Sequence, residues 1–280
     1  MVAEVVVGIL VGSLALVTDA GHMLTDAAAV ALALVATRLA TRPAAGSYTF
    51  GLKRAEILSA QANGVTLLVL VVFFCYEAVR RLVTPPDVAG VPVVVTALAG
   101  VVVNLVVVVL LRRASRRSLA VEGAFQHILN DLFAFVGTAI AGAAVWLTGW
   151  TRADAVAALV VAALMAKAGY GLIRESGRVF LEAAPRGTDP EHVGTDLRGL
   201  DGVVGVHDLH LWEVTSAFTA LSAHVLVAPD RDCHRIRVAA EAMLARRYGI
   251  EHTTLQVDHR DTRQALPTPS FRDDEGSGSP

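Results

Sequence analysis

Long apolar runs separated by short charged segments fill the first two-thirds of this 280-residue chain. A helix needs about 20 apolar residues to cross a bilayer. Only 18% of the residues are charged, against about a quarter in soluble domains. The sequence therefore predicts a polytopic α-helical membrane domain followed by a soluble domain. Full spans are predicted over residues 18–39, 55–79, 91–111, 119–147 and 153–173.

The N-terminal run, residues 2–17, is apolar apart from Glu4 and Ser13, but it is short for a span. It has no basic segment before its apolar part, and further spans follow, which argues against a signal peptide. We expect a first span that is shortened by a truncated or misassigned start.

Basic residues near the span ends predict the orientation. Eleven of them follow the second, fourth and sixth spans, and three lie on the opposite side. The first group is Arg38, Arg42, Lys53, Arg54, Arg112, Arg113, Arg116, Arg117, Arg174, Arg178 and Arg186; the second is Arg80, Arg81 and Arg152. Because cytoplasmic loops carry the excess of Lys and Arg, we expect a multi-pass protein of the plasma membrane with its C-terminal domain in the cytoplasm.

The soluble part begins near Pro185. A helix over 189–200 is predicted, with Asp189 as its N-cap and Pro190 in its first turn. Strands follow over 203–214 and 220–228, then a helix over 230–248 that Gly249 ends, and a strand over 253–258. The order α-β-β-α-β predicts a small sheet with helices on one face. Residues 261–280 are rich in Pro, Ser, Gly and Asp and are predicted to be disordered.

Regular alternation along the first of these strands would divide its side chains between two faces. One face would hold Val206, Asp208, His210, Trp212 and Val214, and the other His207, Leu209 and Leu211. The two cysteines, Cys75 and Cys233, indicate no disulfide framework. The net charge of −2 gives no sign of nucleic-acid binding.

Two His-xxx-Asp pairs lie inside apolar spans: His22 with Asp26, and His127 with Asp131. Residues four apart share one helix face, and ionisable groups at membrane depth are costly and usually functional. Two imidazoles and two carboxylates form a four-ligand set that suits Zn²⁺, with Co²⁺ and Cd²⁺ as alternatives. The competing interpretation is a pair of structural His–Asp hydrogen bonds between packed helices.

Other polar residues near these pairs have less specific roles. Asp19 could share the face of His22, but we expect it to cap the helix start. Asn104, Gln126 and Asn130 could orient the ligands or make ordinary contacts between helices.

Several stretches resemble the cation diffusion facilitator family of zinc transporters, in the family's order. They are GSLALVTDAGHMLTD (12–26), YTFGLKRAEILSAQANG (48–64), EAVRRL (77–82), EGAFQHILNDL (122–132), VHDLHLW (206–212), LSAHVLV (221–227) and IEHTTLQVDH (250–259). The resemblance implies six transmembrane helices over 1–180, a cytoplasmic ferredoxin-like α+β domain over 185–260, and a homodimer that exports zinc in exchange for protons. Glu4 is similar to an acidic residue midway along the family's first helix, so from the resemblance we expect this sequence to lack about half of that helix.

The resemblance also implies site residues. His22, Asp26, His127 and Asp131 match the transport-site positions, and His207, His224, His234 and Asp258 match a cytoplasmic zinc site. Gln256 stands where some members have a further His; candidates to replace it are His210, His252, His259 and Cys233. Tyr48 and Leu52 stand where some members place His, so no loop site is carried over. Arg54 and Glu182 resemble a charge interlock, with a solvated surface pair as the alternative.

The proton coupling that the resemblance implies agrees with the chemistry of the ligands. Imidazole and carboxylate must lose their protons to bind metal, so protons and Zn²⁺ compete for the same groups. From the resemblance together with this competition, we expect a proton-coupled zinc exporter that works by alternating access, with Zn²⁺ as cargo and regulator and no other cofactor. The alternatives are a membrane metal sensor that does not transport and an intramembrane zinc metalloenzyme. The chain has no His-Glu-xx-His motif to favour the enzyme.

Overall fold

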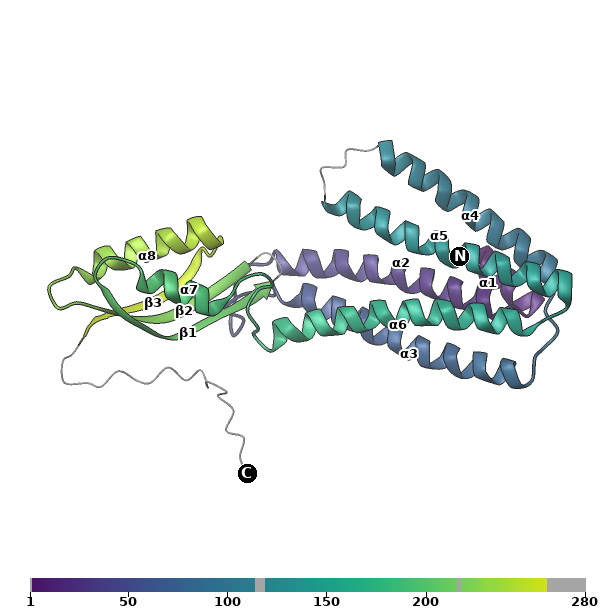
Figure 1. The fold of residues 1–280 in the computed structure, drawn as a ribbon, viewed down its shortest axis with the longest axis horizontal. Coiled ribbons are helices and arrows are strands. Elements are labelled where there is room, and N and C mark those ends of the chain that lie inside the picture. Colours follow the sequence, from purple (N-terminus) through teal and green to yellow (C-terminus); the bar gives the residue numbers. More distant parts are fainter. Residues whose placement is uncertain (1, 114–118, 216–217, 261–280) are drawn as a thin grey trace, which may run out of the picture. The chain divides into compact units, whose positions relative to one another are not determined.

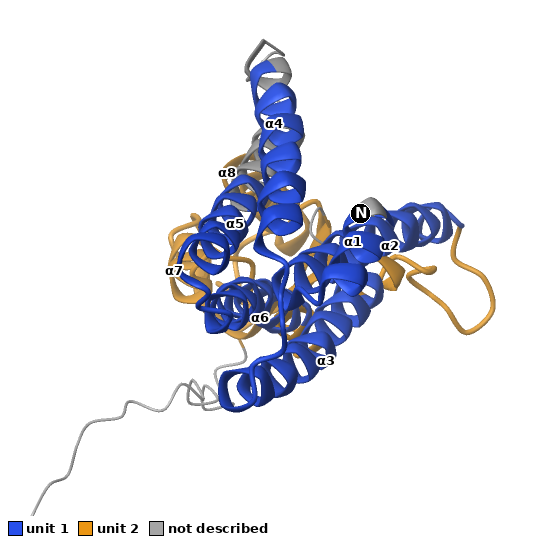
Figure 2. Cartoon of the chain, turned by 90° about the vertical axis from the view of Figure 1, so that its right-hand side faces the viewer, with its two compact units in different colours: residues 1–42, 58–176 blue, residues 43–57, 177–280 orange. Residues whose placement is uncertain are grey.

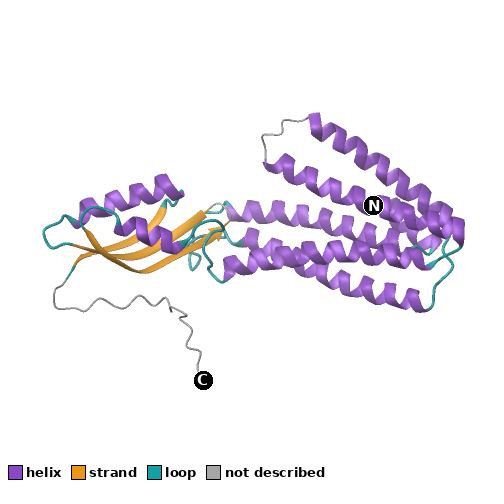
Figure 3. Cartoon of the chain, in the orientation of Figure 1, coloured by secondary structure: helices purple, strands orange, loops and turns teal. Residues whose placement is uncertain are grey.

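The computed structural model describes residues 2–113, 119–215 and 218–260, leaving out the side chains of residues 3 and 110–130. The chain divides into two compact units, residues 1–42 with 58–176 and residues 43–57 with 177–280 (Figure 2). The first unit is helical, and the second contains the sheet (Figure 3). The predicted disorder of residues 261–280 lies outside the described residues.

Long helices make up the first unit (Figure 1). They are α1 Val2–Val11, α2 Leu14–Ala40, α3 Ala55–Val83, α4 Gly90–Arg113, α5 Leu119–Thr148 and α6 Arg152–Phe180, of which α3 and α6 each continue into the second unit by a few residues. In the described part of the chain, α2 to α6 each contain a stretch long and apolar enough to cross a membrane. Many large apolar side chains on these helices are exposed, as expected of surfaces that face lipid.

The start of α2 differs from the prediction. The helix begins at Leu14 rather than near residue 18, and its N-cap is Ser13, whose hydroxyl accepts a hydrogen bond from the Leu16 amide. Asp19 lies inside α2 and is 1% exposed, so its prediction as a cap is wrong. The apolar run 2–17 made one continuous segment plausible, but Gly12 adopts a φ of 71° and separates α1 from α2.

A buried carboxylate from α6 completes this break between α1 and α2. Asp154 accepts hydrogen bonds from the Ser13 hydroxyl at 2.5 Å and from the Leu14 amide at 2.6 Å. The first N–H groups of a helix have no partner within the helix, and a negative charge there is favourable. Asp154 therefore stabilises the start of α2 from a residue 140 positions away.

Arg81 holds the other side of the break. Its guanidinium donates to the Gly12 carbonyl at 2.5 Å and to the Glu77 carboxylate at 3.0 Å. Arg80 donates to the same carboxylate at 2.8 Å. These two arginines oppose the charge rule used for orientation, and the contacts give a structural reason for their position.

Small residues allow helices to approach closely in the first unit. A Cβ built on Gly64 of α3 would lie 3.0 Å from the Gly169 carbonyl of α6, and one built on Gly169 would lie 3.0 Å from the Gly64 carbonyl. Such reciprocal backbone contact is typical of packed membrane helices. It brings the middle of α3 against the middle of α6.

The second unit contains a mixed sheet. It is built from α7 Pro190–Arg198, β1 Val203–Thr215, β2 Phe218–Val227, α8 Cys233–Tyr248 and β3 His252–His259. β2 is central, antiparallel to β1 and parallel to β3. Both helices contribute to one apolar core with the sheet, through residues such as Val193, Leu221 and Leu244. The predicted cap at Asp189 and the left-handed Gly249 that ends α8 are confirmed.

β1 contains a bulge that the sequence did not reveal. Its register with β2 shifts between His207 and His210, and Asp208 between them has a φ of 53°. His207 pairs with His224, and His210 pairs with Ser222. Ser222 and His224 are two residues apart on β2, so they lie on one face of the sheet. Because paired residues share a face, His207 and His210 also lie on that face, and the predicted strict alternation is wrong here.

The segment 43–57 packs against one end of the second unit's sheet. The Phe50 ring lies 6.4 Å from Phe218 and 5.8 Å from His252, centroid to centroid. The Lys53 ammonium lies 3.8 Å from the centroid of Phe218. Edge-on aromatic contacts and a cation over a ring each stabilise modestly. Together they fasten this segment near the start of β2 and β3.

Asp154→Ala tests the junction between α6 and the start of α2. We expect the midpoint of unfolding in detergent to fall and the free energy of unfolding to drop by about 2 kcal/mol, because the Ser13 hydroxyl and Leu14 amide lose a buried acceptor. Asp201→Ala is the control: it removes an exposed carboxylate paired with Arg231 and should cost under about 0.5 kcal/mol. Equal losses in the two variants would contradict this role for Asp154.

Candidate metal centres

The His22–Asp26 pair lies on one face of α2, as its spacing predicts. The Nδ1 atom of His22 is 3.6 Å from an Asp26 carboxylate oxygen, and both side chains are partly buried. Asp131 approaches from α5, where its carboxylate oxygen is 4.0 Å from the His22 Nε2 atom. Three of the four expected transport ligands are therefore neighbours. The fourth, His127, belongs to the residues whose side chains the structure does not describe.

Each ring nitrogen of His22 faces a different carboxylate. A ring nitrogen holds either a proton or a metal ion, so a nitrogen that binds metal must be free of its proton. Two donors of one tetrahedral zinc lie roughly 3.3 Å apart, given metal–ligand distances near 2 Å. Binding one zinc ion between these groups would therefore require small shifts of the ring and a carboxylate.

A cavity of about 530 Å³ opens beside these side chains. It is lined by residues of α2, α3, α5 and α6. The described polar side chains in its lining are those of His22, Asp26, Asn63, Asp131 and Lys167. Asn63 and Lys167 were not among the predicted site residues. A lysine in the middle of an apolar span was the signal that could have identified one of them.

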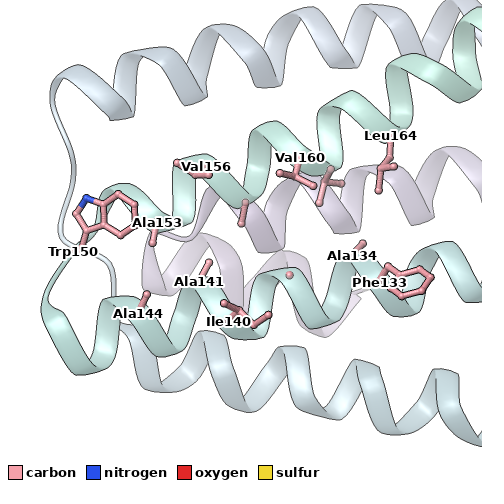
Figure 4. Close-up of a pocket in the computed structure, with 13 residues that line it drawn as sticks. Phe133, Ala134, Ile140, Ala141, Ala144, Trp150, Ala153, Val156, Val160 and Leu164 are labelled. Carbon is pink, nitrogen blue, oxygen red and sulfur yellow. The ribbon is translucent and has the colours of Figure 1, made fainter.

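A second, apolar cavity of about 520 Å³ adjoins the first along α5 and α6. Figure 4 shows Phe133, Ile140, Val156 and Leu164 around it, with Trp150 at one end. The two cavities share Ala134, Val161 and Leu164. Its described lining residues include no carboxylate or imidazole, so of these two cavities only the first has metal ligands among the described side chains.

The predicted cytoplasmic site is partly brought together. The rings of His207 and His224 are 5.1 Å apart between centroids, as neighbours on β1 and β2. The bulge adds two residues to this group: Asp208 lies 3.7 Å from the His224 Nε2 atom and 3.0 Å from the His210 Nε2 atom. His210 was predicted as a substitute ligand, whereas no role was predicted for Asp208.

The other predicted cytoplasmic ligands have different neighbours. The Asp258 carboxylate accepts a hydrogen bond from Gln256 at 2.7 Å. The Cys233 sulfur lies 3.7 Å from the His259 ring, and His234 is exposed in the first turn of α8. Among the described residues, no three His, Cys, Asp or Glu side chains are placed to hold one metal ion. The set of His207, His224, His234 and Asp258 stays a prediction.

Of the other residues singled out, Arg54 and Glu182 do meet. Their charged groups are 3.2 Å apart, but the Glu182 side chain is 61% exposed, so the pair contributes little free energy by itself. Asn104 donates to the Gly100 carbonyl of its own helix at 3.0 Å, which satisfies its amide locally. Gln126 and Asn130 lie outside the described side chains.

Comparison with known proteins decides the family. The model for the cation efflux transmembrane domain matches residues 1–181, and the model for the cation efflux protein cytoplasmic domain matches residues 185–260. The chain belongs to the cation diffusion facilitator family. It is therefore a multi-pass plasma-membrane protein with a cytoplasmic C-terminal domain, and its family is one of transporters.

Curated relatives in this family resemble the chain over most of its length. A cadmium, cobalt and zinc/H(+)-K(+) antiporter of Bacillus subtilis is 35% identical over 92% of this chain and 84% of its own. The zinc transporter ZitB of Pectobacterium atrosepticum is 37% identical over 93% and 82%. The metal cation efflux system protein CzcD of Cupriavidus metallidurans is 35% identical over 95% and 84%.

The His207–His224 pair generates a test of the cytoplasmic site. Asp131→Ala silences the membrane site and serves as the background. In equilibrium dialysis, we expect the double variant Asp131→Ala/His224→Ala to bind fewer zinc ions per chain than Asp131→Ala alone. His192→Ala is the control, since that residue is exposed on α7. Unchanged stoichiometry in the His224 variant would remove this pair from the ligand set.

Proposed function

We propose that this protein exports divalent cations, zinc first, from the cytoplasm in exchange for protons, as a homodimer that works by alternating access. The observation that carries the proposal is the position of His22 between Asp26 and Asp131, beside a cavity bounded by four helices. One imidazole and two carboxylates, with His127 as the expected fourth ligand, suit Zn²⁺, Cd²⁺ and Co²⁺. The names of the relatives agree with these metals and, in one case, with proton exchange.

The proton coupling follows from the same side chains. Protons that occupy these groups offset part of the negative charge that a bound Zn²⁺ would otherwise balance. Zn²⁺ that arrives from the cytoplasm must displace those protons to reach the ring nitrogen and the carboxylate oxygens. When the site faces the other side of the membrane, protons compete with the metal again and favour its release.

Alternating access and the homodimer are part of this proposal. The described polar cavity provides one binding place for the ion. If this cavity opens to only one side of the membrane at a time, the protein does not form an open channel. The matched cytoplasmic family domain is named for dimerisation. We infer that two copies meet through this domain, and that zinc bound near His207 and His224 strengthens their contact.

Asp131→Ala tests the transport site. In vesicles with the cytoplasmic domain outside and an acidic lumen, we expect wild-type protein to move external zinc inward as protons leave. The variant should lose this flux by more than about 100-fold, beyond the 10–100-fold typical of residues that only orient ligands. A zinc-sensitive dye in the lumen measures the rate.

The control is Asp87→Ala, which removes an exposed carboxylate from the same unit. It should keep wild-type flux, and both variants should elute as folded dimers in size-exclusion chromatography. Undiminished flux in Asp131→Ala would place the ion elsewhere. A wild-type rate that ignores the pH gradient would contradict the proton coupling.

A further inference from the structure

Lys167 is a cationic residue in the middle of the membrane span α6. It lies 15 residues from the start of that helix and 13 from its end, within an apolar run. Charged side chains at this depth are rare, face a cavity or the interior of the protein, and mark functional sites. Neither the ligand set nor the proton competition described above uses this ammonium group.

The structure places Lys167 on the cavity-lining face of α6. The α6 residues around the polar cavity are Val161, Leu164, Lys167, Ala168, Gly171 and Leu172. Their spacing of three and four residues is that of a single helix face. His22, Asp26 and Asp131 line the same cavity, so the lysine shares one cavity with the expected transport ligands.

Helix geometry places Lys167 at the depth of Asp26. Ser13 and Asp154, joined by a hydrogen bond, mark a common level at the start of α2 and α6. Asp26 lies 13 residues beyond Ser13 on α2, and Lys167 lies 13 residues beyond Asp154 on α6. Both helices run in the same direction from that level (Figure 1). At 1.5 Å per residue, each side chain is about 20 Å from it.

We propose that Lys167 is the built-in counter-cation of the transport site. This inference rests on the proposed function of that site. When no metal is bound, the ammonium group balances part of the negative charge of Asp26 and Asp131. When Zn²⁺ arrives, like charges share the cavity, and their repulsion keeps zinc affinity low enough for rapid release.

Lysine suits this role better than arginine would. Its ammonium is a compact, strongly hydrated point charge on a flexible stem, so it can approach the carboxylates and withdraw as a metal ion enters. The contact between Gly64 and Gly169 holds the backbone of α6 against α3 two residues away. The Lys167 side chain is therefore attached to a backbone held in place, and we expect its ammonium group to move only within the cavity.

The test compares zinc affinity in variants of Lys167 by titration calorimetry on full-length protein, with His207→Ala and His224→Ala in every sample. We expect Lys167→Met and Lys167→Gln to bind zinc at least tenfold more tightly than the parent and to transport it more slowly. Lys167→Arg keeps the charge and should stay within threefold of the parent affinity. The matched control is Lys53→Met, because Lys53 is the chain's other lysine and lies in the segment 43–57.

Unchanged or weaker zinc binding in both neutral variants would overturn the proposal, as would an equal gain from Lys53→Met. Agreement between the Met and Gln variants separates loss of charge from a packing defect in either one. Failure of the exporter proposal is distinguishable, because it appears as Asp131-dependent zinc binding without flux in the parent protein. The affinity change at Lys167 can be measured in either case.

Discussion

The buried contact between Asp154 and the start of α2 fixes how α2 and α6 lie along one another, and the proposed transport site depends on this register. Three donors around Ser13, Leu14 and Ala15 converge on one carboxylate, so α6 cannot slide along α2 without leaving buried polar groups unsatisfied. Because this register is fixed, residues equally far along both helices stay level. Asp26 and Lys167 form such a pair. At roughly 1.5 Å per residue, they lie about 20 Å along their helices from the hydrogen bonds of Asp154. Those hydrogen bonds therefore help to set which charged side chains line the polar cavity.

Charge balance then governs what the cavity can hold. In a low-dielectric surrounding, two charged carboxylates are costly unless cations balance them. Under the proposed function, those cations are bound protons, the Lys167 ammonium and Zn²⁺. The transported ion would then exchange with charges that the protein already carries. Its release would need only small movements of His22, because its two ring nitrogens already face different carboxylates.

Local patterns in the sequence predicted local structure well. Apolar runs predicted the spans, and the four-residue spacing placed His22 and Asp26 on one face. Asp189 caps the start of α7 and Gly249 ends α8, as predicted. Contacts between distant residues were not predictable, because Asp154 carries no signal of its partner at Ser13. The bulge at Asp208 was missed for a similar reason: a left-handed residue other than glycine leaves no mark in an alternating strand. Asp19 was misassigned because the break at Gly12 was not recognised.

Proton release on metal binding measures most directly whether zinc displaces protons from the site at His22. Zinc is added to detergent-solubilised protein in weakly buffered solution while a pH dye reports released protons. We expect proton release in proportion to zinc bound, with the membrane-site portion absent in Asp131→Ala. Zinc binding at this site without proton release would contradict it.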